Sequence, residues 1–177
     1  MTAPATVRQL EHGDAHAWSA LRLEALQREP LSFGSSVPDD PGTLADRFLE
    51  RLMPRADAAI FGAFDASSMI GIVGLRRHDG AKERHIALIW GMYVTARARR
   101  CGAGQLLMEH AIASARRWSG VEQVQLSVTD AAPDAMRLYE RCGFLAWGTQ
   151  PRALLWAGRH VDEVHMALDL RDARHSP

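Results

Sequence analysis

Hydrophobic residues recur along this chain with two different periods. Apolar runs and alternating apolar and polar positions, typical of β-strands, occupy residues 6–10, 58–64, 69–77, 84–94, 121–128, 144–149 and 161–168. Apolar residues spaced three and four apart, which predict amphipathic helices, occupy residues 15–28, 43–52, 102–118 and 133–142. The segment 30–42 is rich in Pro, Gly, Ser and Asp, and we predict a loop there. The pattern therefore predicts an α/β (α+β) protein that mixes strands and helices.

Polar and turn-forming residues mark the ends of several of these elements. Asp14 and Thr43 precede helical stretches, and we expect their side chains to cap the helices. Gly143 follows the last helical stretch at a position suited to a left-handed backbone. A final hairpin is expected to turn near residues 157 and 158.

The length of 177 residues fits a single domain spanning residues 1–177, with a core over about 7–170. Residues 171–177 are expected to be a frayed tail. No secretory signal and no stretch long enough to span a bilayer is found, so we expect a cytoplasmic protein without membrane association. Cys101 and Cys142 have neither disulfide nor metal-ligand spacing, and no metal is expected.

The charge balance limits the kinds of molecule that we expect this chain to bind. Arg and Lys together number 21, and so do Asp and Glu, so no global basic field favours nucleic acid. Basic residues are instead concentrated in the short segment 97–100.

That basic segment lies in the most informative stretch of the chain, residues 94–108. It combines a strand end, a loop with Gly102 and Gly104, and the beginning of a helix. Unpaired N–H groups at a helix N-terminus bind phosphate, and glycines let a ligand approach the backbone closely. Three arginines supply further donors for phosphate oxygens: Arg97, Arg99 and Arg100. The spacing matches neither a Walker A loop nor a dinucleotide-binding fingerprint.

A second motif follows at residues 134–144, with the sequence DAMRLYERCGF. Ala135, Leu138 and Cys142 share one helical stripe, and Tyr139 lies beside it. Together, R-x-x-G-x-G at 99–104 and A-x-x-L-Y-x-x-x-G-F at 135–144 resemble the two motifs of the GNAT superfamily of N-acetyltransferases, in particular its bacterial-type members.

The resemblance implies a fold and an activity. The GNAT fold is a central twisted mixed sheet of about seven strands, splayed between strands 4 and 5 and flanked by about four helices. The implied activity is direct transfer of acetyl from acetyl-CoA, the co-substrate, to a primary amine within a ternary complex. Two alternatives remain open: a non-catalytic acyl-CoA-binding or sensory module, and an acyltransferase that uses a longer acyl-CoA.

The resemblance also assigns roles to residues. Tyr139 is the candidate general acid, and a backbone N–H near Met92 is the candidate oxyanion donor. Gly91 either marks a β-bulge in this strand or reflects ordinary packing. The residues expected to bind acetyl-CoA are Met92, Tyr93, Val94, Arg99, Arg100, Cys101, Gly102, Ala103, Gly104, Gln105, Ala132, Ala135 and Tyr139.

The chain departs from the family pattern at Ala132, where many members carry asparagine. The contact of that asparagine with the pantetheine arm is therefore absent, or is replaced by Thr129 or Asp130. This change is expected to weaken cofactor binding modestly.

The general base and the acceptor site are less well defined. His85, Glu24 and Glu163 are the candidate bases, and a water chain without a dedicated base is the other possibility. The acceptor is a small-molecule amine or a peptide or protein N-terminus, and a homodimer is plausible from the family. Residues 31–36 are expected to form part of a lid. The candidate acceptor-site residues are Phe33, Trp90, Trp156 and His160, with Asp39, Asp40 and Glu163 available to attract an ammonium group.

Overall fold

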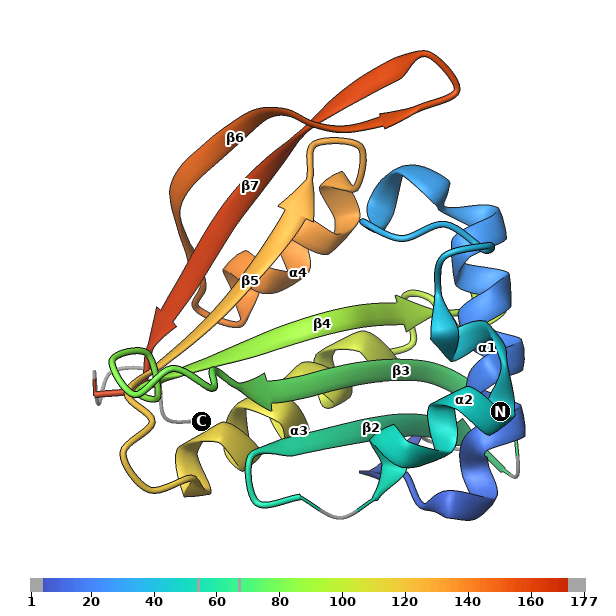
Figure 1. The fold of residues 1–177 in the computed structure, drawn as a ribbon, viewed down its shortest axis with the longest axis horizontal. Helices are drawn as coiled ribbons and strands as arrows, with labels where there is room; N and C mark the ends of the chain where they lie inside the picture. Colours follow the sequence, from blue (N-terminus) through green and yellow to red (C-terminus); the bar gives the residue numbers. More distant parts are fainter. Residues whose placement is uncertain (1–4, 54, 67, 172–177) are drawn as a thin grey trace.

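The computed structural model describes residues 5–53, 55–66 and 68–171, and seven strands within them form one sheet (Figure 1). The strand order is β1-β2-β3-β4-β5-β7-β6. The helices and strands are β1 (Thr6–Gln9), α1 (Ala15–Arg28), α2 (Ala45–Phe48), β2 (Ala58–Asp65), β3 (Ser68–Arg77), β4 (Ile86–Val94), α3 (Ala103–Arg117), β5 (Gln123–Thr129), α4 (Pro133–Arg141), β6 (Leu145–Trp156) and β7 (Arg159–Asp169).

The sheet is split between β4 and β5. These two strands run parallel and pair at three positions, Ile86 with Gln123 through Leu88 with Gln125, whereas the other neighbouring strands pair antiparallel. Beyond Leu88 the strands diverge, and Figure 1 shows β4 and β5 separating from a common end. The predicted mixed sheet of seven strands, splayed between strands 4 and 5, is confirmed.

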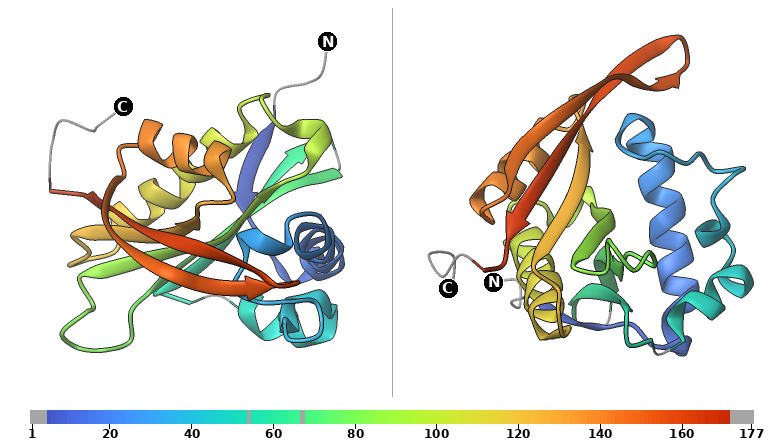
Figure 2. Two further views of the ribbon diagram at one scale, coloured as in Figure 1. Left: turned by 90° about the horizontal axis from the view of Figure 1, so that it is seen from above. Right: turned by 60° about the vertical axis from the view of Figure 1, so that its left-hand side comes forward.

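Two hydrophobic clusters hold helices against the two faces of this sheet (Figure 2). On one face, α3 buries Leu107 and Ala111 against β2, β3 and β4. On the other face, α1 packs Trp18 against Phe48, with ring centroids 4.4 Å apart and the ring planes stacked. Side chains alternate between the faces along a strand, so β3 and β4 contribute to both clusters.

The predicted number of helices is corrected from four to three long ones, α1, α3 and α4. Within the predicted helix 43–52, the helical part is a single turn, α2, and a 3₁₀ turn over Leu49–Leu52 follows it. Another 3₁₀ turn, Pro41–Thr43, occupies the predicted start. So short a helix cannot form from its own hydrogen bonds, and burial of Phe48 and Leu52 stabilises the segment in place of helix length.

The two predicted N-caps are wrong, and the predicted helix end is confirmed. The Asp14 carboxylate does not cap α1, because it accepts the Glu11 N–H at 2.8 Å and two bonds from Arg8. The Thr43 hydroxyl donates to the carbonyl of Asp40 at 2.8 Å. Gly143, with a φ of 91°, follows α4 in the left-handed region.

The last hairpin is longer than predicted. β6 was expected to end at residue 149, but it continues to Trp156 through an irregularity between Gln150 and Leu154. Arg152 lies in this irregularity and has a φ of 53°. Side chains do not alternate regularly between the two faces at such a position, so the sequence shows no apolar alternation that would predict a strand there. The turn at residues 157 and 158 is confirmed by the positive φ of both residues.

Of the predicted tail 171–177, residues 172–177 lie outside the described residues. No helix among the described residues is long and apolar enough to cross a membrane.

Candidate active site

A cleft of about 970 Å³ opens where β4 and β5 separate. Residues 89–94 of β4 and 126–128 of β5 form two of its sides. The loop before α3, the first turn of α3 and one face of α4 contribute further lining. At the wide end, the 3₁₀ turn Pro30–Ser32 contacts β5 and β6, so the segment after α1 spans the two halves of the sheet.

A β-bulge lies in β4 at the centre of this cleft. Trp90 pairs with Gly74 and Tyr93 pairs with Ile72, so both Gly91 and Met92 oppose the single residue between them on β3. Gly91 adopts a φ of +64°, which favours glycine. Of the two interpretations of this glycine, the structure confirms the bulge. The extra residue disrupts the hydrogen bonds between β4 and β3 at the bulge. Beyond Leu88, the edge of β4 that faces β5 has no strand partner, so its main-chain groups are available to a ligand.

The loop before α3 presents backbone donors to the same cleft. Arg100 and Gly102 both have positive φ, 63° and 82°, which turns the chain sharply into the helix. No side chain in the part of the chain that the structure describes caps α3, and the first intrahelical bond runs from the Leu106 N–H to the Gly102 carbonyl at 3.0 Å. The N–H groups of the first turn, including that of Gly104, therefore have no intrahelical partner and can bind an anion.

The three arginines of this loop differ in their contacts. Arg99 donates to the Val94 carbonyl at 3.1 Å and to Glu29 at 2.8 Å, so it fixes the loop to β4 and to the end of α1. Arg100 lines the cleft. Arg97 lies outside the lining, 3.8 Å from Asp65. Of the three loop arginines, Arg99 and Arg100 therefore line the cleft, and Arg137 and Arg141 of α4 add two further guanidinium groups to its lining.

Tyr139 reaches the cleft from α4, where its ring is buried and packs edge-on against Phe144. Burial raises the pKa of Tyr139 far above its usual value, and the nearby Cys142 adds to the increase. A phenol is protonated at neutral pH even with its ordinary pKa of about 10, so Tyr139 has a proton to donate. Ala132 also lines the cleft, whereas Thr129 and Asp130, the two expected replacements for asparagine, do not.

Most of the residues expected from the sequence to bind ligands meet in this one cleft. Thirteen expected residues line it: Phe33, Trp90, Met92, Tyr93, Val94, Arg99, Arg100, Gly102, Gly104, Gln105, Ala132, Ala135 and Tyr139. Nine lie outside its lining: Glu24, Asp39, Asp40, His85, Cys101, Ala103, Trp156, His160 and Glu163. Ala103 is buried in the core beneath the loop, and Cys101 is exposed.

The three candidate bases are far from equivalent. The Glu24 carboxylate on α1 accepts the Tyr93 hydroxyl at 2.9 Å and the Thr95 hydroxyl at 2.7 Å. Burial together with this hydrogen bond raises the pKa of Tyr93 to about 12. His85 lies before β4, at the end where β4 and β5 are still paired, and Glu163 lies on β7. Glu24 alone among the three is connected to a residue of the lining.

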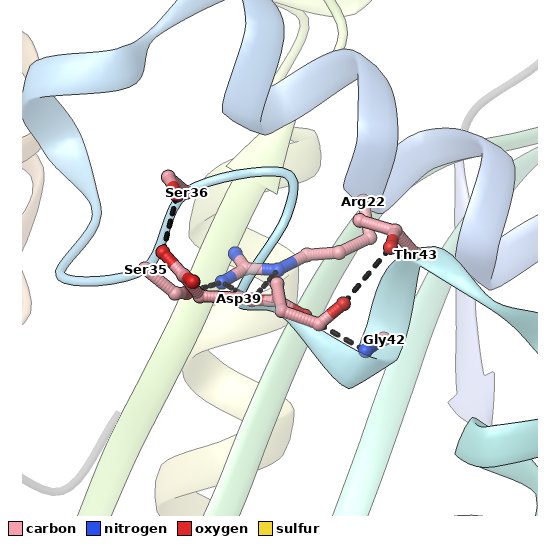
Figure 3. Close-up of polar contacts among 7 residues, drawn as sticks. Arg22, Ser35, Ser36, Asp39, Gly42 and Thr43 are labelled. Carbon is pink, nitrogen blue, oxygen red and sulfur yellow. Dashed lines mark hydrogen bonds and ion pairs between the residues drawn. The ribbon is translucent and has the colours of Figure 1, made fainter.

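Two of the acidic residues expected to attract an ammonium group, Asp39 and Asp40, already accept hydrogen bonds within their own segment or from α1. Asp40 accepts hydrogen bonds from Arg22 at 2.6 and 3.1 Å, from the Ser35 hydroxyl at 2.6 Å and from the Gly42 N–H at 2.8 Å (Figure 3). Burial alone would raise the pKa of Asp40, but these bonds outweigh it and lower the pKa. Asp39 accepts the Ser36 hydroxyl at 2.5 Å.

Two features of the site were missed in the sequence. Arg22 follows Trp18 by one helical turn, so an arginine within the apolar stripe of α1 was the available signal for a buried ion pair. Gly74 opposes Trp90 across the ladder, and a Cβ at Gly74 would lie 2.1 Å from the indole. Only the strand register reveals this second relation.

The chain is similar in sequence to a known protein family and to individual proteins. Residues 20–144 match the model of the Acetyltransferase (GNAT) family. The L-amino acid N-acetyltransferase AaaT of Escherichia coli (strain K12) is 26% identical over 159 residues, which are 89% of this chain and 95% of that protein. The mycothiol acetyltransferase of Salinispora tropica is 29% identical over 145 residues, which are 80% of this chain and 45% of that protein.

Solved structures share the fold. The structure of yncA from Salmonella typhimurium with its cofactor acetyl-CoA has a TM-score of 0.82 at 18% identity, covering 99% of this chain and 98% of that chain. An acetyltransferase of the GNAT family from Streptococcus pneumoniae has a TM-score of 0.81 at 23% identity, covering 94% and 99%.

Proposed function

Because the chain belongs to the GNAT family of acetyltransferases, we propose that it transfers acetyl from acetyl-CoA directly to a primary amine while both substrates are bound. Acetyl-CoA is the acetyl donor of this family. The observation that carries the proposal is the convergence, in one cleft, of the β4 bulge, the uncapped N-terminus of α3 and the protonated Tyr139.

The cleft suits a ligand with the shape and charge of acetyl-CoA. The free N–H groups of the first turn of α3, with Arg99 and Arg100, bind the pyrophosphate. Residues 92–94 of β4 have no β5 partner, so this edge of the strand can pair with the pantetheine arm as an added strand would, although the Val94 carbonyl already accepts Arg99. The Ala132 side chain lines the cleft but has no group that can form a hydrogen bond. We therefore propose that backbone groups hold the pantetheine arm.

The residues at the bulge and on α4 then divide the chemistry. The backbone N–H near Met92 stabilises the oxyanion that develops when the amine attacks the thioester carbonyl. The Tyr139 hydroxyl donates a proton to the departing thiolate of CoA. Glu24 is our proposed route for the proton lost by the amine, through water, because its carboxylate is already hydrogen bonded to Tyr93 in the lining.

The similar proteins do not identify the amine that accepts the acetyl group. Their names refer to L-amino acid and mycothiol acetylation, and a further structural neighbour is a ribosomal-protein-alanine N-acetyltransferase of Brucella melitensis. An amine on a small molecule and an amine at a peptide N-terminus are both consistent with this range. A homodimer also stays a prediction.

The test is release of CoA from acetyl-CoA by the purified protein, measured against amino acids, short peptides, polyamines and aminoglycosides. We expect release with at least one of these classes, and mass spectrometry should show an increase of one acetyl group in the acceptor. If acetyl-CoA binds but no amine is acetylated, the result favours an acyl-CoA-binding module or a longer acyl donor.

A further inference from the structure

Arg22 is a buried arginine next to the cleft whose hydrogen bonding is incomplete. Its side chain is 7% exposed, and its ion-pair partner Asp40 is 10% exposed. Nε and Nη2 donate to Asp40, and Nη2 also donates to the Ser35 hydroxyl at 3.1 Å (Figure 3). Nη1 is fully buried and has no hydrogen-bond partner among the described residues.

The unused nitrogen lies beside the bulge. Nη1 is 3.9 Å from the point at which a side chain on Gly91 would begin. The Phe33 ring, which lines the cleft, lies over the guanidinium at 4.6 Å. Arg22 also lines a second cavity of about 200 Å³, and Trp90 is shared between this cavity and the main cleft. Space for a small polar group therefore exists on the same side of β4 as the guanidinium.

A purely structural role does not account for Nη1. The bonds from Nε and Nη2 are sufficient to hold the segment 35–40 against α1. A buried donor of a charged group left without an acceptor is costly, so Nη1 requires an acceptor oxygen, which a water supplies in the free protein and a ligand can supply in the complex.

We propose that Nη1 of Arg22 binds a carboxyl or carboxamide oxygen of the acceptor, so that the substrate is an α-amino acid or the N-terminal residue of a peptide. The proposal rests on the acetyl transfer proposed above. Arg22 is then a specificity-determining residue: it orients the acceptor and takes no part in proton transfer.

The geometry places that oxygen close to the reacting amine. The N–Cα, Cα–C and C=O bonds keep an α-amine and its carboxyl oxygen within about 4 Å of each other. Gly91 and Met92 form the bulge at which the acetyl carbonyl is proposed to lie, and Nη1 is adjacent to it. One acceptor can therefore contact Nη1 and present its amine at the bulge at the same time. An amine without such an oxygen would leave Nη1 unpaired in the bound state.

The first experiment compares three forms of one acceptor. The proteinogenic amino acid with the highest kcat/KM is tested beside its amide and its decarboxylated amine, which differ only at the carboxyl position. We expect kcat/KM of the decarboxylated amine to be about 10- to 100-fold lower than that of the better of the other two, the range for a hydrogen bond to a charged group. A higher rate with the acid points to free amino acids, and a higher rate with the amide points to peptide N-termini.

The second experiment removes the guanidinium. Arg22→Met is expected to abolish the preference for the oxygen-bearing acceptors while retaining acetyl-CoA affinity, and Arg28→Met, an exposed arginine on the same helix, serves as the matched control. Circular dichroism and thermal unfolding identify any variant that fails to fold.

The inference and the proposed function fail in different ways. Acetylation of polyamines or aminoglycosides but of no amino acid or peptide, or equal kcat/KM for all three matched acceptors, would overturn the role of Arg22 and leave acetyl transfer intact. Absence of CoA release with every amine, together with no binding of the amino acid in calorimetry, would overturn both.

Discussion

At the scale of single residues, burial raises the pKa values of the two tyrosines of the cleft. The Tyr139 phenol loses hydration on α4, and the Tyr93 phenol loses it between β4 and α1. Both pKa values rise, Tyr93 to about 12, because a low-dielectric surrounding disfavours the phenolate. Tyr93 has its hydrogen bond to Glu24, which makes it a fixed part of the wall.

Tyr139→Phe is expected to lower kcat by about 100-fold, because general acid catalysis contributes at least that factor. The ring remains, so the packing against Phe144 and the affinity for acetyl-CoA should change little. Steady-state kinetics and calorimetry separate the two quantities. Normal turnover by this variant would show that another group protonates the leaving thiolate.

At the scale of elements, the site depends on two irregularities at the ends of regular structure. The bulge in β4 changes which face each following residue points to: Ile89 and Met92, three residues apart, pack into the same cluster, although Trp90 lies on the opposite face. The uncapped first turn of α3 leaves backbone donors unsatisfied. Both irregularities reduce local stability and face the same cleft, which is typical of a binding site.

Gly102→Glu is expected to abolish acetyl-CoA binding, because it places a negative charge at a helix N-terminus that binds phosphate. Gly102→Gln is the matched control, since it shares the unfavourable positive φ and the bulk but carries no charge. We expect a weaker loss with Gln than with Glu in calorimetry. Micromolar binding by the Glu variant would remove this loop from the site.

Gly74→Ala is expected to impair the acceptor more than the donor. Its Cβ would overlap the indole of Trp90, which must then move within the cleft. KM for the acceptor should rise several-fold, whereas the dissociation constant for acetyl-CoA should stay within about twofold. Gly13→Ala, where a Cβ meets nothing, is the control. Equal weakening of both substrates would indicate general disorder of β3 and β4.

At the scale of the whole molecule, the Arg22–Asp40 pair joins α1 to the loop that leads to α2. It closes the cluster in which Trp18 stacks on Phe48, on the face of the sheet opposite α3. The Arg22–Asp40 ion pair therefore affects two properties: the stability of the cluster between α1 and the sheet, and the shape of the part of the cleft in which the acceptor is proposed to bind.

This pair should make stability sensitive to acid. The folded pKa of Asp40 is lowered, so its contribution to the free energy of unfolding is complete above the unfolded pKa of about 4 and is lost as the pH falls through the lower folded value. Asp40→Asn should cost about 3 kcal/mol or more in urea unfolding at pH 7, and less at pH 3. Asp57→Asn, which breaks an exposed pair with Arg55, should have little effect at either pH.

The sequence by itself determined the features that short-range chemistry controls. The order of strands and helices follows from hydrophobic periodicity, and the loop at 99–104 and the helix at 133–141 were recognisable because their residues resemble the two motifs of the GNAT superfamily. Twelve of the thirteen expected residues that line the cleft reach it for the same reason, since they lie within or beside these two motifs and the strand before them, whereas Phe33 comes from the segment after α1.

Only the tertiary structure decided the contacts between distant segments. The length of α2, the bonds of Glu24 to residues about 70 positions away, the fit of Gly74 to Trp90 and the placing of Asp40 against Arg22 all depend on which elements pack together. Local preferences carry no information on such packing, because the free energy that selects it comes from burial and from pairing polar groups across the chain. The split between β4 and β5 was expected from the resemblance of the motifs to the GNAT superfamily, whereas the unpaired nitrogen of Arg22 beside it became visible only once the chain was folded.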